Sequence, residues 1–259
     1  MTAPIITLTT DFGLRDPFVG VMKGVILAIC PAARLVDLTH EIAPQDVLEG
    51  ALALESGARF FPPGTIHLAV VDPGVGSAQR GLALRAGDYF FVGPDNGLFT
   101  AALAGRGWSA VSLENPAYRL TEVSPTFHGR DIFAPAAAHL ACGIALERFG
   151  PPVKDPVRLP WPECRAQGSG WVGEVIGADR FGNLITSVTA ARLEGAGGWE
   201  VEIGGRSLGP LAACYADGPE GRPAALIGSS GRLEVFVRNG SARALLGAER
   251  GMEVRVSRP

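Results

Sequence analysis

The sequence predicts two domains, an α/β domain with a mostly parallel sheet followed by a smaller antiparallel β domain. The first 150 residues alternate short strand-like runs with helical patterns. Residues 65–71 are almost wholly apolar, which is typical of a strand buried on both faces of a parallel sheet. After a stretch rich in Pro and Gly the pattern changes to short alternating strands. We therefore place the domains at 1–155 and 170–259, with a linker at 156–169.

The first domain is expected to begin with a strand at 5–10. Asp16 can cap a helix with Pro17 at its first position, and this helix would end before Pro31. The other expected strands lie at 35–38, 65–71, 82–85 and 89–92, and the other helices at 44–56, 99–104 and 132–149.

The second domain is expected to contain short strands with regular turns between them. This pattern indicates a small antiparallel barrel or sandwich. The strands are expected at 171–176, 184–188, 199–203, 224–227, 233–237 and 253–256.

Composition excludes several classes of protein. The 259 residues include 23 basic and 26 acidic ones, and a net charge of -3 gives no general attraction for nucleic acid or an anionic membrane. The longest charge-free apolar stretch, 132–146, is shorter than the ~18 residues that a membrane span needs. Without a basic N-terminal segment no secretory signal is expected, so we predict a cytoplasmic protein. The four Cys are scattered and form no CxxC, so neither a zinc site nor a disulfide framework is expected.

Three loops of the first domain place carboxylates where an open α/β sheet binds its ligands. They are TTDFG at 9–13, VVDPGVG at 70–76 and VGPDNG at 92–97. One such loop alone is more often a turn or a helix cap, but three in one domain favour a site. Neither GxGxxG nor GxxxxGK[ST] is present, and Asp72 would repel a phosphate. Aspartates suit ribose hydroxyls or a cationic group instead.

Histidines and a second-domain loop add further candidates. No two His are spaced four apart and no HExxH occurs, so no catalytic metal is expected. His67 and His139 lie in apolar segments and are interpreted as structural, whereas His128 lies in the loop PTFHGRD at 125–131. In the second domain DRFGN at 179–183 is either a tight hairpin turn or part of a site.

Six motifs carry a resemblance to a known family. In order along the chain they are TTDFG, VVDPGVG, PDNGLF, PTFHGRDIFAP, DRFGN and SSGRLEV. Together they resemble the S-adenosylmethionine hydroxide adenosyltransferase family, relatives of the fluorinase and chlorinase enzymes. The resemblance implies a Rossmann-like N-terminal α/β domain, a C-terminal antiparallel β-barrel domain, and a homotrimer. Its active sites would lie between the N-domain of one subunit and the C-domain of its neighbour.

The hydroxide branch of this family converts S-adenosylmethionine and water into adenosine and methionine, so the resemblance implies an adenosine-forming hydrolase. The substrate already carries a sulfonium, so methionine is a good neutral leaving group and no metal or cofactor is expected. When the family pattern is carried onto matching positions, it implies that Asp72 and His128 contact the reacting water. It also implies substrate-binding roles for Asp11 at the ribose, Thr126 and Phe127 at the nucleoside, Tyr215, Arg238 and Asn239 at adenine, Asp179 and Asn183 at the methionine ammonium, Ser229 and Ser230 at its carboxylate, and Asp16 and Phe181 near the methionine end.

The third catalytic position departs from the family pattern. The family usually has two consecutive Arg after VDPGVG, of which the first is commonly catalytic, whereas this chain has Gln79 and Arg80. Either Arg80 moves into the role, or Gln79 replaces the guanidinium with a neutral hydrogen bond. We expect Arg80 to be the catalytic residue.

Three further possibilities are alternatives to hydrolysis. The first is a halogenase, but the fluorinase has Tyr at the position of Asp72, Tyr-Ser at the position of His128 and Gly129, and a long insertion at 86–88. A carboxylate at position 72 would also repel a halide, which favours hydroxide transfer. The second is a non-catalytic protein that binds S-adenosylmethionine or adenosine, if the change at Gln79 has removed the chemistry. A structural protein whose Asp-Gly loops are only turns is a third, simpler possibility.

Overall fold

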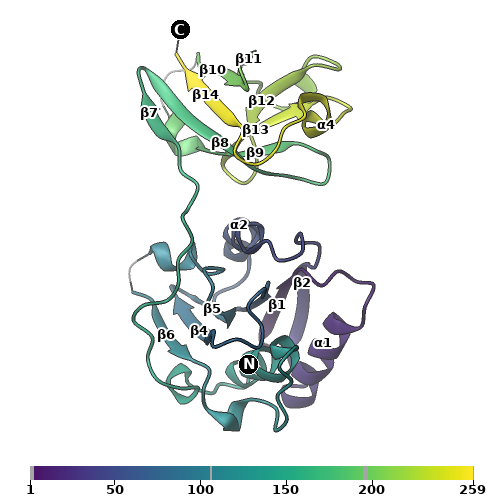
Figure 1. The fold of residues 1–259 in the computed structure, drawn as a ribbon, viewed down its shortest axis with the longest axis vertical. Coiled ribbons are helices and arrows are strands. Elements are labelled where there is room, and N and C mark those ends of the chain that lie inside the picture. Colours follow the sequence, from purple (N-terminus) through teal and green to yellow (C-terminus); the bar gives the residue numbers. More distant parts are fainter. Residues whose placement is uncertain (1–2, 106, 195–197, 259) are drawn as a thin grey trace. The chain divides into compact units, whose positions relative to one another are not determined.

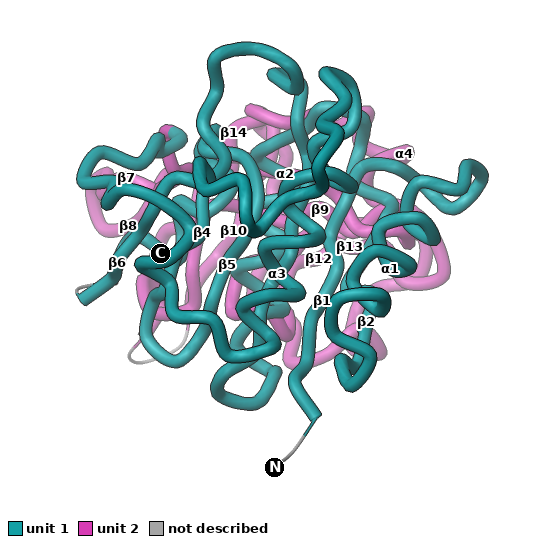
Figure 2. The backbone as a smooth tube through the Cα atoms, turned by 90° about the horizontal axis from the view of Figure 1, so that it is seen from below, with its two compact units in different colours: residues 1–159 teal, residues 160–259 magenta. Residues whose placement is uncertain are grey.

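The computed structural model describes residues 3–105, 107–194 and 198–258. The chain divides into two compact units, residues 1–159 and 160–259 (Figure 2). Each unit is described by itself.

The first unit is built on a six-stranded sheet (Figure 1) with the order β2-β1-β3-β5-β4-β6. Strands β1, β2, β3 and β5 run parallel, and β4 is antiparallel to both β5 and β6. The strands are β1 (Ile5–Thr10), β2 (Arg34–Thr39), β3 (Ile66–Val70), β4 (Gly81–Ala86), β5 (Tyr89–Pro94) and β6 (Ser109–Ser112). The predicted α/β fold with a mostly parallel sheet is thus confirmed.

The described residues of this unit form three α-helices, namely α1 (Phe18–Ile29), α2 (Val47–Gly57) and α3 (Ala134–Ala141). Helix α1 has Pro17 as its N-cap and no side-chain cap, so the prediction that Asp16 caps it is wrong. The helix ends one residue before Cys30, which Pro31 follows, and α2 is capped by Asp46, whose carboxylate accepts the N–H of Glu49 at 2.9 Å. Apolar residues of α1 and α3 form one buried cluster with alternate residues of β1, including Ile6 and Leu8. The hydrophobic pattern of the sequence therefore positions β1 and the loop that follows it.

The other face of β1 carries a buried polar contact. Thr7 pairs in register with His67 of β3, and the Oγ1 atom of Thr7 lies 2.7 Å from Nδ1 of His67. The imidazole is fully buried among the rings of Phe61, Tyr89 and Phe91. This environment agrees with the interpretation of His67 as a structural residue.

Two predicted helices differ from the structure. The helix expected over 132–149 was too long, because a π-helical turn (Gly129–Phe133) precedes α3 and the chain leaves the helix at Gly143, whose φ is +85°. Leu146–Arg148 is a separate 3-10 turn. The helix expected at 99–104 is reduced to a 3-10 turn at Ala102–Ala104. Further 3-10 turns lie at Ala58–Phe60 and Pro116–Tyr118.

The second unit is an antiparallel sheet that curls into a nearly closed barrel. Its order is β11-β10-β14-β8-β9-β13-β12, with β7 paired to β8. The N–H of Ala212, just after β11, donates to the carbonyl of Ala225 on β12 at 2.8 Å and so joins the two ends of the sheet. The elements are β7 (Arg165–Gln167), β8 (Gly170–Ala178), β9 (Leu184–Thr189), β10 (Glu200–Ile203), β11 (Arg206–Pro210), β12 (Pro223–Ile227), β13 (Arg232–Val237), α4 (Ala242–Leu246) and β14 (Glu253–Ser257), with 3-10 turns at Ala190–Leu193 and Tyr215–Asp217. The barrel implied by the family resemblance is confirmed, because the described strands form one sheet with joined ends and not the two packed sheets of a sandwich.

Candidate functional site

Three neighbouring parallel strands of the first unit deliver acidic residues at the same edge of the sheet. Asp11 follows β1, Asp72 follows β3, and Asp95 follows β5. Because β1, β3 and β5 are adjacent and parallel, their carboxyl ends meet at one edge, where open α/β sheets bind ligands. The three loops singled out in the sequence are thus brought to this edge.

The loop after β3 folds Gln79 back onto Asp72. Two turns shape the loop, with the N–H of Val75 donating to the carbonyl of Asp72 at 3.3 Å and the N–H of Ser77 to that of Gly74 at 3.1 Å. The Nε2 amide of Gln79 then donates a hydrogen bond to Oδ1 of Asp72 at 2.8 Å. Asp72 is therefore held by a neutral amide from its own loop.

Burial and the neighbouring hydrogen-bond donors have opposite effects on the pKa of Asp72. Burial of its carboxyl raises the pKa of Asp72 above the ordinary value of 3.8, and the nearby charge of Asp11 adds to this effect. Hydrogen bonds from the Gln79 side chain and the Gly74 backbone, and the charge of His128, lower the same pKa but only in part. A half-buried carboxylate that is harder to ionise than usual, beside an imidazole, is suited to accept a proton from a bound water.

A close backbone contact supports the segment that carries His128. Gly76 has a φ of +79°, and a Cβ atom at this position would lie 2.3 Å from the carbonyl oxygen of Pro125. Only glycine allows this approach, which packs the Asp72 loop against the start of the PTFHG segment. His128 itself directly precedes the π-helical turn, and its charge acts on both Asp72 and the buried Asp131.

Arg80 is bound to other carboxylates. Its Nη2 atom lies 2.7 Å from Oδ2 of Asp95, and its Nη1 atom lies 3.0 Å from Oδ1 of Asp155. The third loop of the sequence therefore contributes Asp95 to an ion pair. The expected catalytic role of Arg80 stays a prediction, while Gln79 is the residue in contact with Asp72.

An aromatic cluster adjoins Asp11. The rings of Phe12, Phe18 and Phe127 meet edge to face, with centroids 5.3 to 5.9 Å apart. Phe12 and Phe18 were not singled out in the sequence, although Phe12 belongs to the TTDFG loop and Phe18 begins the helix that follows it. The side chain of Asp11 accepts the backbone N–H of Gln45 at 2.8 Å.

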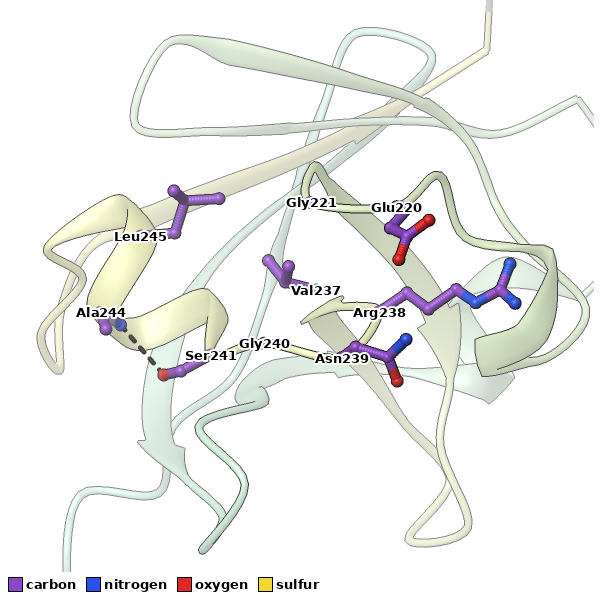
Figure 3. Close-up of a pocket in the computed structure, with 9 residues that line it drawn as sticks. All are labelled: Glu220, Gly221, Val237, Arg238, Asn239, Gly240, Ser241, Ala244 and Leu245. Carbon is purple, nitrogen blue, oxygen red and sulfur yellow. Dashed lines mark hydrogen bonds between the residues drawn. The ribbon is translucent and has the colours of Figure 1, made fainter.

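The second unit contains a cavity of about 590 Å³ at one end of the barrel. Residues from the β8–β9 turn, the 3-10 turn at Tyr215–Asp217 and the end of β13 form its wall. Six predicted binding residues are among those that line it, namely Asp179, Phe181, Asn183, Tyr215, Arg238 and Asn239. A neighbouring cavity of about 500 Å³ shares the Val237–Gly240 segment and is drawn in Figure 3, where the side chains of Arg238 and Asn239 extend to the same side.

The larger cavity is lined by exposed aromatic rings and by a hydrogen-bonded tyrosine hydroxyl. Phe181 is 76% exposed and Tyr215 is 47% exposed, so both rings offer flat surfaces to a ligand. The Tyr215 hydroxyl donates to Oε2 of Glu234 at 2.7 Å, and burial together with this carboxylate raises the pKa of Tyr215 to about 12. The hydroxyl therefore stays protonated and the ring stays in place.

DRFGN forms the β8–β9 turn and also contributes to the cavity. Oδ1 of Asp179 accepts the N–H groups of Phe181 and Asn183, each at 2.9 Å, and its Oδ2 accepts the side-chain amide of Asn183 at 2.8 Å. The turn interpretation of this motif is therefore correct for the local structure, and the same turn presents Phe181 and Asn183 to the cavity. The motif is thus both a turn and a wall of the cavity.

Sequence comparison identifies the family. The models of the N-terminal and C-terminal domains of SAM hydroxide adenosyltransferase match residues 6–150 and 173–255. The chain belongs to the S-adenosylmethionine hydroxide adenosyltransferase family.

The chain is also similar to named relatives and to a solved structure over most of its length. The chain is 47% identical to an (R)-S-adenosyl-L-methionine hydrolase of Thermus thermophilus, over 95% of this chain and 97% of that protein. It is 33% identical to a fluorinase of an Actinoplanes species, over 89% of each chain. A crystal structure of an uncharacterized conserved protein from Thermotoga maritima matches with a TM-score of 0.91 and 34% identity, over 98% of this chain and all of the other.

The remaining residues of the family pattern lie outside the contacts described so far. Thr126 is exposed, and its hydroxyl lies 3.1 Å from that of Ser124; Asp16 is exposed between β1 and α1. Ser229 and Ser230 form the turn between β12 and β13 and do not line the larger cavity. The Ser230 hydroxyl oxygen is buried and has no hydrogen-bond partner among the described residues.

The described ranges contain neither a cluster of metal ligands nor a membrane-spanning helix. Within residues 3–105, 107–194 and 198–258, no group of three or more His, Cys, Asp and Glu side chains is arranged to hold a metal ion. In the same part of the chain no helix combines the length and the apolar character required to cross a bilayer.

Proposed function

We propose that this chain hydrolyses S-adenosyl-L-methionine to adenosine and L-methionine. The hydrolase relatives are named for the (R) form of this substrate, and we extend that form to this chain. Because the label L already fixes the α-carbon of methionine, the (R) descriptor denotes the sulfonium centre.

The proposal depends chiefly on Asp72. In the proposed reaction a water lies in line with ribose C5' and the sulfonium sulfur. Asp72 and His128 orient this water, Asp72 accepts the one proton that it loses, and the C5'–S bond breaks as the C5'–O bond forms. Burial raises the pKa of the half-buried Asp72 carboxyl, and a carboxylate of this kind is suited to this proton transfer. Alignment in a water-excluding pocket supplies up to about 7 to 11 kcal/mol in well-oriented reactions. The leaving group is neutral, so we propose that no metal or cofactor takes part.

The remaining predicted residues would bind the substrate. Asp11 is proposed to hold the ribose hydroxyls, next to the aromatic cluster of Phe12, Phe18 and Phe127. The larger cavity of the second unit is proposed to bind adenine and methionine. Its exposed rings suit a purine, and its polar groups suit the amino acid end.

We also propose a homotrimer in the cytoplasm. The predicted residues fall into one group on each unit, and the family resemblance implies that a site combines the first unit of one subunit with the second unit of a neighbour. Sedimentation equilibrium of the purified chain tests this assembly, because a monomer at micromolar concentration would contradict it.

The function is tested by incubating the protein with each sulfonium epimer in halide-free buffer made with ¹⁸O water. Mass spectrometry should find ¹⁸O in adenosine, together with unlabelled methionine, and more product from the (R) epimer. The Asp72→Asn variant serves as the control for contaminating activity. Intact substrate with measurable binding would instead favour the non-catalytic alternative.

Halogenation is the second function to test, because fluorinases share 31% to 33% identity with this chain. The same incubation with added chloride or fluoride distinguishes the two chemistries. We expect no 5'-halo-adenosine, since the Asp72 carboxylate would repel a halide from the position of the attacking water.

A further inference from the structure

We infer that Gln79 is a positioning residue for Asp72, and that its neutral amide sets the acid limb of the pH–rate profile. The inference rests on the proposed hydrolysis, in which Asp72 contacts the reacting water. Gln79 itself acts only through Asp72.

The contact between Gln79 and Asp72 is built into the loop. A Cβ atom on Gly74 would lie 2.6 Å from Oε1 of Gln79, so glycine at position 74 leaves the space through which the Gln79 side chain folds back. The backbone N–H of Gln79 donates to Oγ of Ser77 at 3.2 Å, which supports the main chain at this position. With the main chain held and the space open, the amide reaches Oδ1 of Asp72 at 2.8 Å.

This hydrogen bond occupies one defined oxygen of the Asp72 carboxylate. Oδ1 of Asp72 accepts the Gln79 amide, and the carboxylate also accepts a hydrogen bond from the backbone of Gly74. Two hydrogen bonds from its own loop favour one rotamer of the Asp72 side chain, so the acceptor positions that remain on the carboxylate point in a defined direction. Such orientation is what an in-line attack requires of the group that holds the water.

The Gln79 amide makes this hydrogen bond to Asp72 without carrying a charge. The charged groups that act on Asp72 are Asp11, after β1, and His128, before the π-helical turn. The neighbouring cation, Arg80, is bound to Asp95 and Asp155. Because Gln79 is neutral, it stabilises the ionised carboxylate less than a guanidinium at the same place would. The carboxylate of this chain therefore ionises at higher pH than it would beside an arginine.

Two substitutions separate the positioning and electrostatic contributions of Gln79. Gln79→Ala removes the hydrogen bond and should lower kcat about tenfold with little change in KM, while moving the acid limb to higher pH. Gln79→Arg adds a cation and should move the acid limb to lower pH by about one unit. Gln167→Arg, the same change on the exposed strand β7, is the matched control for added charge and should leave the limb in place.

The readouts are kcat–pH profiles with (R)-S-adenosyl-L-methionine and ¹³C NMR titration of the Asp72 carboxyl in the same proteins. Circular dichroism confirms that each variant is folded. The midpoints should rise in the order Gln79→Arg, wild type, Gln79→Ala by both methods. Identical midpoints in the three proteins would overturn the inference. If the wild type hydrolyses nothing, the proposed function fails, and the NMR order alone still decides whether Gln79 controls Asp72.

Discussion

Arg80 and Asp95 form an ion pair whose acidic partner is almost completely buried. Nη2 of Arg80 lies 2.7 Å from Oδ2 of Asp95, with the side chain of Asp95 2% exposed and that of Arg80 37% exposed. The second carboxylate oxygen of Asp95 accepts the N–H of Val157 at 2.8 Å, and Asp155 accepts a further hydrogen bond from Arg80. The pair therefore ties residues 155–157 to the end of β5, just before the boundary of the first unit.

Replacing Arg80 by Met should destabilise the first unit. The change leaves the buried carboxylate of Asp95 without its cation, and such a loss costs about 2 kcal/mol after allowance for the exposed arginine. Thermal unfolding followed by circular dichroism measures the shift in Tm. The matched control is Asp155→Asn, which removes the exposed partner, 81% exposed at its side chain, and should shift Tm less. Equal shifts in Tm would show that the contact of Arg80 with the buried Asp95 stabilises the protein no more than its contact with the exposed Asp155.

His67 should make the protein less stable in mild acid. Burial lowers the pKa of His67 to about 4, whereas an exposed histidine in the unfolded chain titrates near 6.5. Between these values the unfolded chain binds a proton that the folded chain does not, so stability falls as the pH drops. The free energy of unfolding should decrease by up to about 1.4 kcal/mol per pH unit in this window because of His67 alone.

The contribution of His67 is isolated by comparing two proteins. Urea unfolding of the wild type and of His67→Gln between pH 4 and 6.5 gives two pH dependences, in which all other groups contribute equally. The wild type should show the steeper decrease toward acid. If both proteins show the same slope, the ring is not kept neutral by burial.

The sequence allowed the strand ends to be predicted more accurately than the contacts between side chains. Strand β1 was expected at its observed bounds, because an apolar run followed by Asp and Gly marks both the strand and its end. Helix α3 was overestimated, since its apolar pattern continues beyond Gly143, where the backbone turns left-handed. The strands β6, β7 and β11 were not predicted from the sequence.

The partners of Gln79 and Arg80 illustrate the limit of sequence reasoning at the site. The two residues are adjacent in the sequence, yet their side chains bind different carboxylates, Asp72 and Asp95. Alternation along an extended segment sends neighbouring side chains in opposite directions, so the choice between them depends on the conformation of the loop. The turns at Gly74 and Gly76 determine that conformation.

Asp72→Asn and His128→Ala should lower turnover much more than substrate affinity. Each change removes a group that orients the attacking water and assists its deprotonation, and loss of general base assistance typically costs about 10² to 10⁴ in rate. Steady-state kinetics with (R)-S-adenosyl-L-methionine measure kcat and KM separately. A rise in KM that accounts for the whole loss would instead assign binding roles to both residues.

Asp11 should show the opposite pattern. Its contacts to the ribose hydroxyls would persist from the bound substrate to the transition state, so Asp11→Ala should raise the Kd of adenosine about tenfold and change kcat less. Calorimetric titration with adenosine measures the affinity. Asp11→Asn is the control for loop structure, because it retains an oxygen to accept the N–H of Gln45. An unchanged Kd in Asp11→Ala would remove Asp11 from the binding site.

The proposed trimer makes a prediction about mixed assemblies. If each site combines the first unit of one subunit with the second unit of its neighbour, Asp72→Asn damages one half of a site and Asp179→Ala the other. Subunits of the two inactive variants, unfolded and refolded together in equal amounts, would form some sites from two intact halves, about a quarter of the total by random assembly. Hydrolysis should therefore reappear at about a quarter of the wild-type rate, provided that the refolded wild type regains its activity. Each variant refolded alone is the control. If the mixture stays as inactive as its components although mixed trimers have formed, both halves of a site come from one chain.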